Sequence, residues 1–422
     1  MSEPIRRAGP SLLEFLQDHV LVFDGGTGTM LYQKGVFLNR CFDELNVSRP
    51  ELIRDVHSAY LQAGAEAIET NTFGANRHKL KGFGLQDKLV EINREGARLA
   101  REAAGDRAWV AGSIGPLGLK IEPWGPTSVE EAEAAFREQA QALLEGGVDL
   151  LVLETFTDLN EIRQAIRAVR GLCSLPIVAQ MTIEEDGNSL YGTAPEVFTK
   201  RLDEWGADVV GINCSVGPQV MLGCLERMVK VTQRPLSVQP NAGKPRSVEG
   251  RNLYLCSPEY MASYARKFVQ AGAKAVGGCC GTTPEHIKAI KSAIRSLRPA
   301  HIAVEISLPA EQRVEITPVD RSRKSRLAAA LVAGRLVTSV EITPPKGFDT
   351  AKVVAGASLL KAAGVDAINI PDGPRASARM SAQALAIILE QQVGIETVLH
   401  YCCRDRNLLG MQSDLLGAPR LA

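Results

Sequence analysis

The sequence has no excess of either charge. Lys plus Arg and Asp plus Glu each total 48 among 422 residues, so the formal net charge is +0 at pH 7. A chain without a net field has no general electrostatic attraction for nucleic acid or for an acidic surface. We therefore expect no nucleic acid among its partners.

Long apolar runs are absent as well. No stretch approaches the roughly 20 apolar residues that cross a bilayer, and residues 1–19 have no uninterrupted apolar core of the kind that signal peptides carry. The nine cysteines are spread thinly, and in a reducing compartment thiols serve metals or catalysis more often than disulfides. The sequence thus predicts a cytoplasmic protein with no membrane as a partner.

A dinucleotide-binding fingerprint is also missing, because the glycine-rich turn GGTGT at 25–29 lacks the G-x-G-x-x-G spacing. What residues 1–295 do contain is an alternation of short Val- and Ile-rich runs with helical patterns, typical of β/α units around a parallel sheet. The predicted strands are 20–26, 67–73, 109–115, 150–156, 177–183, 209–215, 236–243 and 275–281. Eight such units favour an α/β fold of the closed (β/α)8 TIM barrel type.

The pattern changes after the eighth strand. Residues 298–326 combine prolines with a basic cluster, which predicts an interdomain linker. The alternation then restarts, with strands at 338–343, 366–370 and 397–402 and helices at 350–363 and 376–392. Three units are about a third of a barrel. We therefore expect a first domain at 1–297, a linker at 298–326, and an incomplete second β/α barrel at 327–422.

Polar residues stand at the C-terminal end of every predicted strand of the first domain. They are Asp24, Glu69, Asn71, Thr72, Ser113, Glu154, Gln180, Thr182, Asn213, Cys214, Gln239, Asn241, Cys279 and Cys280. The C-terminal ends of the strands carry the active site in barrels of this kind. We expect the functional site at this mouth of the barrel.

Three of these residues are cysteines, Cys214 in GINCSVGP and the adjacent Cys279 and Cys280 in GGCCGTTPEH. Neighbouring side chains on a strand point to opposite faces, so the pair can reach one ion only where the strand ends and bends, which the flanking glycines permit. Thiolates select zinc, and three protein ligands leave a fourth position open. The alternative is that they are ordinary buried thiols.

A zinc ion held by three thiolates suits a further thiolate better than it suits water activation. Coordination deprotonates a substrate thiol, which then becomes a nucleophile for a methyl group. Asp24 and Glu154 could hold an ammonium group, and the backbone N–H groups of the GGTGT turn could receive a carboxylate. The alternatives are a cap or turn role for Asp24 and a structural ion pair for Glu154.

Several motifs carry a family resemblance. DGGTGTMLYQKG, PELIRDVHSAYLQAGAEAIETNTFGANRHKL, LVLETF, GINCS, QPNAG and GGCCGTTPEHI resemble the homocysteine S-methyltransferase family across nearly all of residues 1–295. The resemblance implies that zinc on Cys214, Cys279 and Cys280 activates homocysteine for methylation to methionine. It makes the first domain a homocysteine-binding methyltransferase barrel.

The resemblance also assigns substrate residues. It implies that Asp24 and Glu154 bind homocysteine, with Gly25 near the substrate, and that Asn241 occupies the fourth zinc position until homocysteine displaces it. ETNTFGAN is similar to the cobalamin-dependent branch of the family more than to the betaine-dependent one. The donor candidates are a methyl sulfonium such as S-methylmethionine or a separate corrinoid protein, and the sequence does not choose between them.

The second domain has its own resemblance. LVTSVEITPPKG, DAINIPDGPRASARMSAQALA and HYCCRDRNLLGMQSDLLGA are similar to the opening of methylenetetrahydrofolate reductase, a flavin-dependent barrel. This implies that Glu341 assists protonation of the folate and that His400 lies beside FAD, which is expected only for a complete domain. A barrel-mouth ion pair and a strand-end histidine are the alternatives. Cys402 and Cys403 lack flanking glycines and a third thiol, so we interpret them as strand residues.

Together these features favour a zinc-dependent homocysteine methyltransferase, whose parent enzyme also reduces 5,10-methylenetetrahydrofolate to 5-methyltetrahydrofolate. Two other hypotheses remain open at this point. One is a flavin-dependent reductase with an accessory barrel, and the other is a non-catalytic scaffold that binds zinc or exchanges thiols.

Overall fold

The computed structural model describes residues 7, 9–37, 39–248, 251–297, 319–373, 378–403 and 406–417. Contacts divide the chain into two compact units, Met1–Leu308 and Pro309–Ala422. Most of the predicted linker, 298–318, lies outside the described residues. None of the described helices combines the length and the apolar character that a membrane crossing requires.

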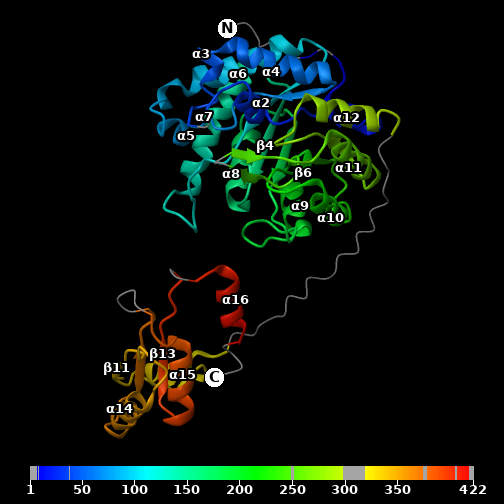
Figure 1. Ribbon diagram of the computed structural model, residues 1–422. Coiled ribbons are helices and arrows are strands. Elements are labelled where there is room, and N and C mark those ends of the chain that lie inside the picture. The colour runs from blue at the N-terminus through cyan, green and yellow to red at the C-terminus, as the bar shows by residue number, and fades with distance from the viewer. Residues whose placement is uncertain are drawn as a thin grey trace. The chain divides into compact units, whose positions relative to one another are not determined.

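The first unit is an eight-stranded parallel barrel (Figure 1). Its strands are β1 (Leu21–Val22), β2 (Ala67–Glu69), β3 (Trp109–Ile114), β4 (Leu150–Phe156), β5 (Ile177–Met181), β6 (Val209–Asn213), β7 (Leu236–Gln239) and β10 (Ala273–Val276). They pair in the order β1-β10-β7-β6-β5-β4-β3-β2. A parallel bridge between Phe23 and Ala67 joins the two ends of this order. The predicted TIM barrel is therefore confirmed.

Helices surround the strands on the outside (Figure 1). They are α1 (Leu12–Asp18), α2 (Thr27–Gln33), α3 (Leu45–Ser48), α4 (Pro50–Ala63), α5 (Arg77–Lys81), η1 (Gln86–Lys88), α6 (Leu89–Ala104), α7 (Val129–Gly146), α8 (Leu159–Arg170), α9 (Pro195–Glu204), α10 (Pro218–Met228), α11 (Pro258–Gln270) and α12 (Pro284–Ile294). Several begin with proline, whose missing N–H is not needed in the first helical turn. Capping boxes at Ser11 and Ser128 start α1 and α7.

Apolar side chains fill the part of the barrel interior near the N-terminal ends of the strands. Phe23, Trp109 and Val152 belong to one buried cluster drawn from the strands, and Leu12 and Leu16 of α1 belong to the same cluster. A second, larger cluster joins the strands to the surrounding helices. Because α1 covers the N-terminal end of the barrel interior, the polar residues at the C-terminal strand ends form the accessible mouth.

All barrel strands except β4 are shorter than the sequence predicts. The eighth was expected at 275–281 but spans Ala273–Val276, so the cysteine pair lies in the loop beyond it. Similarly, β6 ends at Asn213, one residue before Cys214. An antiparallel hairpin of β8 (Arg246–Val248) and β9 (Arg251–Leu253) was not predicted.

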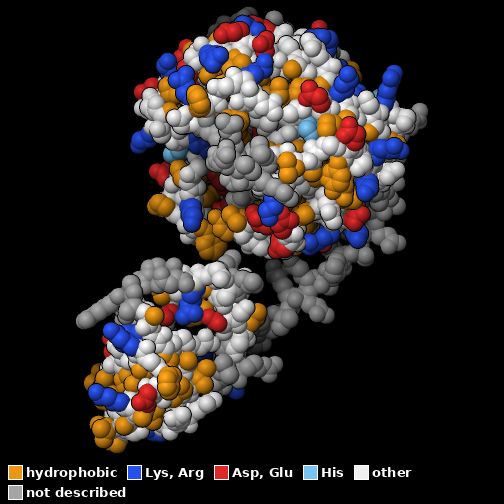
Figure 2. Space-filling view, viewed as in Figure 1, with side chains coloured by type: hydrophobic (Ala, Val, Ile, Leu, Met, Phe, Trp, Pro, Cys, Tyr) orange, Lys and Arg blue, Asp and Glu red, His pale blue; other side chains and the backbone are white. Residues whose placement is uncertain are grey.

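The second unit contains one parallel sheet with the order β11 (Ser339–Glu341), β12 (Ala367–Ile370) and β13 (Glu396–Leu399). Its helices are η2 (Arg321–Arg323), α13 (Arg326–Val332), α14 (Ala351–Ala362), α15 (Ala382–Gln392) and α16 (Leu408–Gly417). Three β/α units agree with the expected partial barrel. Hydrophobic side chains gather on the visible surface around α14 (Figure 2), where Leu359 is 73% exposed. The interpretation of Cys402 and Cys403 as strand residues is wrong, because β13 ends at Leu399.

Candidate functional site

The three predicted metal ligands converge. The sulfur atoms of Cys214, Cys279 and Cys280 all lie within 4.8 Å of one another, and they form the one cluster of this kind among the described residues. The Sγ atoms of Cys214 and Cys280 are 3.8 Å apart. Two thiolates on one tetrahedral zinc ion are about 3.8 Å apart when each Zn–S bond is about 2.3 Å. The arrangement fits a zinc ion without further movement of this pair.

Unusual backbone conformations aim the sulfurs. Cys214 and Ser215 have φ angles of 59° and 62°, in the left-handed region that L-residues seldom adopt. Gly281, directly after the cysteine pair, has a φ angle of 80°, which glycine adopts without cost. These turns lift both loops off their strands, so that thiols from β6 and from the β10 loop face one point.

Neighbouring donors favour the ionised form of one thiol in the trio. Hydrogen bonds from the thiols of Cys214 and Cys279, with a further one from the Tyr254 hydroxyl, lower the pKa of Cys280 to about 3. Tyr254 also packs on the backbone of Gly281, where an added Cβ would overlap its ring. The tyrosine thus covers one side of the trio while contributing a donor to it.

Asp24 lies at the tip of β1 with no exposed surface. Its Oδ2 accepts a 3.0 Å hydrogen bond from the backbone N–H of Glu69. Its Oδ1 is buried and has no hydrogen-bond partner among the described residues. A buried carboxylate oxygen without a partner is costly, and it marks a position where a donor from a ligand would be accommodated.

Glu69 is a neighbouring carboxyl group that sequence reasoning named only as a strand-end residue. Its Oε1 accepts a 2.9 Å hydrogen bond from Nε2 of Gln239. Gln239 in turn accepts a 2.6 Å hydrogen bond from Gln180. This chain of amides crosses the interior below the mouth and fixes Glu69 beside Asp24.

Glu154 is held from two sides. Ser113 donates a 2.5 Å hydrogen bond to its Oε1, and Nδ2 of Asn213 donates a 3.1 Å bond to its Oε2. The same Nδ2 lies 4.0 Å from Sγ of Cys279. Glu154 and the sulfur trio therefore share one neighbour, Asn213, which the sequence analysis named only as a strand-end residue.

Burial raises the pKa of all three carboxyl groups. Burial raises the pKa of Asp24 well above its ordinary range, and the charge of Glu154 adds to the effect. Burial also raises the pKa of Glu69, with contributions from Glu154 and Asp24, and it raises that of Glu154. Three buried acids close together disfavour full ionisation. The mouth is therefore prepared for a cationic group.

The loops that follow the first and the last strand of the barrel are hydrogen-bonded to each other at the mouth. The N–H of Gly26 donates to the Thr282 Oγ1 at 3.0 Å, and the Tyr60 hydroxyl donates to the Thr282 carbonyl at 3.0 Å. An added Cβ at Gly25 would lie 2.5 Å from the Thr282 Oγ1. Glycine is thus required at Gly25 for close approach. Because the N–H of Gly26 is engaged, it is not free to receive a carboxylate as the sequence suggested.

Asn241 lies beside the trio but is engaged with the backbone. Its Oδ1 accepts a 3.0 Å hydrogen bond from the N–H of Cys280, and the residue is 3% exposed. This bond orients the loop that carries the cysteine pair. Its expected role as a fourth zinc ligand stays a prediction.

In the second unit, Glu341 ends β11 and His400 follows β13, and both are exposed. The two strands flank β12 on opposite sides. The expected roles of Glu341 in folate protonation and of His400 beside FAD stay predictions.

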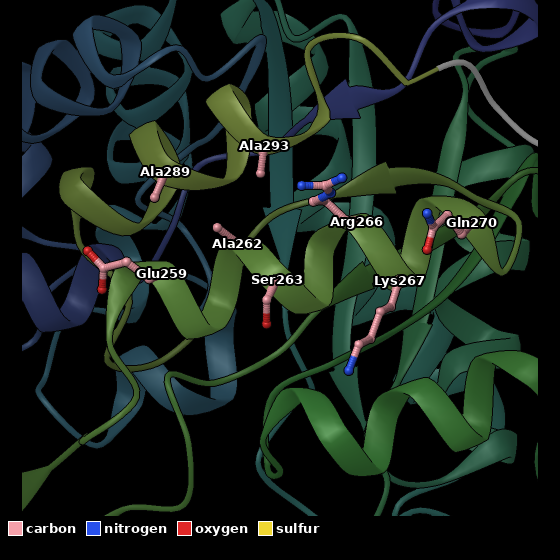
Figure 3. A pocket seen from close by; sticks show the side chains of 8 residues that line it. All are labelled: Glu259, Ala262, Ser263, Arg266, Lys267, Gln270, Ala289 and Ala293. Carbon is pink, nitrogen blue, oxygen red and sulfur yellow. The ribbon is translucent and has the colours of Figure 1, made fainter.

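A separate groove lies on the outside of the barrel between α11 and α12 (Figure 3). Its lining consists of Glu259, Ala262, Ser263, Arg266, Lys267, Gln270, Ala289 and Ala293. These side chains include no thiol and no member of the acid cluster. The groove is therefore not part of the site at the mouth.

Comparison with known proteins agrees with this site. The family model described as homocysteine S-methyltransferase matches residues 21–294, and that of methylenetetrahydrofolate reductase matches residues 326–421. Methionine synthase of Mycobacterium tuberculosis is 32% identical over 305 residues, which cover 68% of this chain and 26% of that protein. Methionine synthase of Mycobacterium leprae is 33% identical, with 67% and 25% covered. The chain thus spans about a quarter of the length of these curated relatives.

Solved structures give the same assignment. The metallated form of the homocysteine methyltransferase MmuM from Escherichia coli is 28% identical with a TM-score of 0.57, covering 66% of this chain and 98% of that one. Its apo form has a TM-score of 0.53, with 67% and 98% covered. The chain therefore belongs to the homocysteine S-methyltransferase family and carries, after its barrel, a segment that matches methylenetetrahydrofolate reductase.

Proposed function

We propose that the first unit transfers a methyl group to the thiol of homocysteine, giving methionine, on a zinc ion held by Cys214, Cys279 and Cys280. The single observation that carries this proposal is the convergence of the three sulfurs within 4.8 Å at the mouth of the barrel. Three thiolates leave a fourth position for the sulfur of the substrate.

The acid cluster supplies the second half of the substrate site. The ammonium group of homocysteine would pair with Asp24, whose Oδ1 has no partner among the described residues, and with Glu154, which faces the sulfur trio through Asn213. Raised pKa values for both carboxyls agree with a site that ionises fully only when a cation arrives. Gly25 lets the loop that carries Thr282 approach closely next to Asp24, since an added Cβ would lie 2.5 Å from the Thr282 Oγ1.

The chemistry divides between the metal and the chain. When bound, zinc lowers the pKa of the homocysteine thiol so that the sulfur is a nucleophile near neutral pH. The residues of the chain fix the two ends of the amino acid and so align its sulfur with the methyl group. With a sulfonium donor, a carbon–sulfur bond forms on homocysteine, one breaks on the donor to leave a neutral thioether, and the thiol proton passes to solvent.

Two kinds of methyl donor are candidates. A methyl sulfonium such as S-methylmethionine suits the mouth because buried carboxyls attract a cation. A corrinoid protein as a separate partner is the other candidate, since the curated relatives named methionine synthase are about four times longer than the matched segment.

The test uses the full chain. Protein loaded with zinc is mixed with homocysteine and, separately, with S-methylmethionine, S-adenosylmethionine, betaine or methylcobalamin, and methionine is measured. Formation of methionine with at least one donor, dependent on zinc, supports the proposal. Zinc binding without any response of the metal site to homocysteine would instead favour a zinc-binding scaffold.

For the second unit we propose descent from a methylenetetrahydrofolate reductase, so that the parent protein both makes and uses methyl groups, in the cytoplasm. The match over residues 326–421 supports this. Glu341 and His400 are the proposed folate and FAD residues of such a parent. A yellow, FAD-bearing preparation that oxidises NADH would favour reductase activity in this chain, and a colourless one would confine activity to the barrel.

A further inference from the structure

Asn213 touches both halves of the site. Its Nδ2 lies 3.1 Å from Oε2 of Glu154 and 4.0 Å from Sγ of Cys279. It is 1% exposed, and it ends β6, directly before Cys214. Because the same Nδ2 atom lies close to both groups, these two distances set an upper limit to the separation between the Glu154 carboxylate oxygen and the Cys279 sulfur.

The amide also clamps the residue after Glu154. The N–H of Thr155 donates to Oδ1 of Asn213 at 2.8 Å, and Nδ2 donates to the Thr155 Oγ1 at 2.9 Å. Thr155 has a φ angle of 63°, which is rare for a β-branched residue. Such a conformation persists only where the surroundings over-determine it. Both amide atoms of Asn213 are therefore committed to holding the end of β4.

The same strand end adjoins a second unusual conformation. Cys214 has a φ angle of 59°, so Asn213 lies between two left-handed positions, one covalently next to it and one hydrogen-bonded to it. Two strands that are not neighbours, β4 and β6, are thus tied together across β5 at the mouth. The site has little freedom to change its length.

From these contacts we propose that Asn213 is a positioning residue that sets the span between the ammonium end and the thiol end of the substrate, and thereby selects homocysteine over cysteine. This rests on the proposed function, in which Glu154 holds the ammonium group and the sulfur trio holds the metal. Cysteine is shorter than homocysteine by one methylene, so a rigid span that fits homocysteine binds cysteine less tightly. One methylene is worth about 10- to 200-fold in discrimination.

The test measures thiol binding, and its readout does not depend on turnover. Full-length protein loaded with Co²⁺ is titrated with homocysteine and with cysteine, and the thiolate-to-metal absorbance gives a dissociation constant for each. Asn213→Ala removes every side-chain contact of the clamp. Asn213→Asp keeps the size and the acceptor for the Thr155 N–H but removes the N–H donors to Glu154.

The matched control is Asn93→Ala. Asn93 is also a fully buried asparagine, and its Nδ2 donates to the carbonyls of Ala75 and Leu89 at 2.8 Å each, within and next to α6. The Asn93→Ala variant shows how much stability is lost when a buried amide is removed that contacts neither the sulfur trio nor Glu154. It should lower the melting temperature and leave the preference between the two thiols unchanged.

We expect Asn213→Ala to keep one metal per chain and to weaken homocysteine binding by about tenfold or more, with a much smaller change for cysteine. The preference for homocysteine then falls by about the same factor, and Asn213→Asp shows the same direction. If Asn213→Ala does not fold, Asn213→Asp is judged by the same criterion. An unchanged preference, an equal loss for both thiols, or loss of the metal would overturn the proposal. Failure of the wild-type protein to bind either thiol would instead count against the proposed function.

Discussion

The backbone N–H of Glu69 donates a 3.0 Å hydrogen bond to Oδ2 of Asp24, and the other oxygen of that carboxyl is buried without a partner among the described residues. The acid that follows the first strand thus has a hydrogen-bond partner for only one of its two carboxylate oxygens. The unsatisfied half costs stability in the free protein, and it is available to a substrate ammonium group.

Asp24→Asn should therefore stabilise the fold and abolish substrate binding. Burial raises the pKa of Asp24 in the folded protein, so folding favours the protonated carboxyl group. The free energy of unfolding is therefore highest below the unfolded pKa, and it decreases as the pH rises through the folded pKa. A neutral amide avoids that loss. We expect an increase of about 1 kcal/mol in unfolding free energy at neutral pH, measured by denaturant titration, together with loss of homocysteine binding. A variant that is less stable at neutral pH and binds homocysteine normally would contradict this account.

Cys279→Ser should remove the metal site. Zinc content, measured by atomic absorption after dialysis, should fall from about one per chain to a small fraction, because two thiolates no longer meet the tetrahedral requirement. Cys256→Ser is the control, since Cys256 is a free thiol near the mouth that is not part of the trio. Equal zinc content in the Cys279 variant and the control would show that the trio is not the metal site.

Gly281→Ala should weaken metal binding, whereas Gly192→Ala should not. Both glycines are left-handed, with φ angles of 80° and 76°, so each substitution costs about 1–2 kcal/mol of backbone strain. An added Cβ at Gly281 meets the ring of Tyr254, whereas at Gly192 it meets nothing within 4 Å. We expect a larger loss of stability for Gly281→Ala, because the overlap with Tyr254 adds to the backbone strain, and a lower zinc affinity only for Gly281→Ala, measured by chelator competition. Equal zinc affinities would mean that Tyr254 has no influence on the trio.

His57 should make the protein sensitive to acid. The residue is fully buried in α4, and neither ring nitrogen has a hydrogen-bond partner among the described residues. Burial lowers its pKa from 6.5 to about 4. Because the unfolded chain binds the proton more tightly, stability is lost as the pH falls from the unfolded value toward the folded one, by up to about 3 kcal/mol.

His57→Leu should abolish that loss, so the variant gains stability relative to wild type as the pH falls from 7 to 4 in thermal or denaturant unfolding. His286→Leu is the contrasting variant. His286 is also buried, but its ring nitrogens bond Thr283 and the Cys256 carbonyl at 3.0 and 2.9 Å. The His286→Leu variant should be destabilised by about 1–3 kcal/mol, because its substitution leaves the buried Thr283 and Cys256 groups without their hydrogen-bond partner. A parallel pH dependence for wild type and His57→Leu would rule out His57 as the source of acid sensitivity.

The barrel could be predicted because its strands are short apolar runs separated by amphipathic helices. All eight strands lie where the sequence places them, and all but β4 end earlier than predicted. For example, β2 stops at Glu69, whereas the apolar and polar pattern continues to Phe73. The pattern reports burial, and residues of a barrel mouth remain buried after they have left the ladder. The β8–β9 hairpin escaped prediction because its residues have no clear alternation.

The sulfur trio could be predicted because thiols have few roles and the glycines around the pair signal a bend. The neighbours that organise it could not. Asn213 and Glu69 were visible as polar strand-end residues, but their importance depends on which atoms they reach across the mouth. The engaged N–H of Gly26 was likewise invisible, since its partner Thr282 lies 256 positions away in the sequence.

The long sequence separation between the first and last strands of the barrel affects the order in which the site forms. The seam of the barrel joins β1 to β10, and the Thr29 hydroxyl accepts a 2.9 Å hydrogen bond from the N–H of Gly281. Acids from the first strand and sulfurs from the last meet only after this seam is closed. During synthesis, a ribosome-bound chain would present Cys214 long before its two companions emerge, so we expect metal uptake to be the final event of barrel formation and a direct report that it is complete.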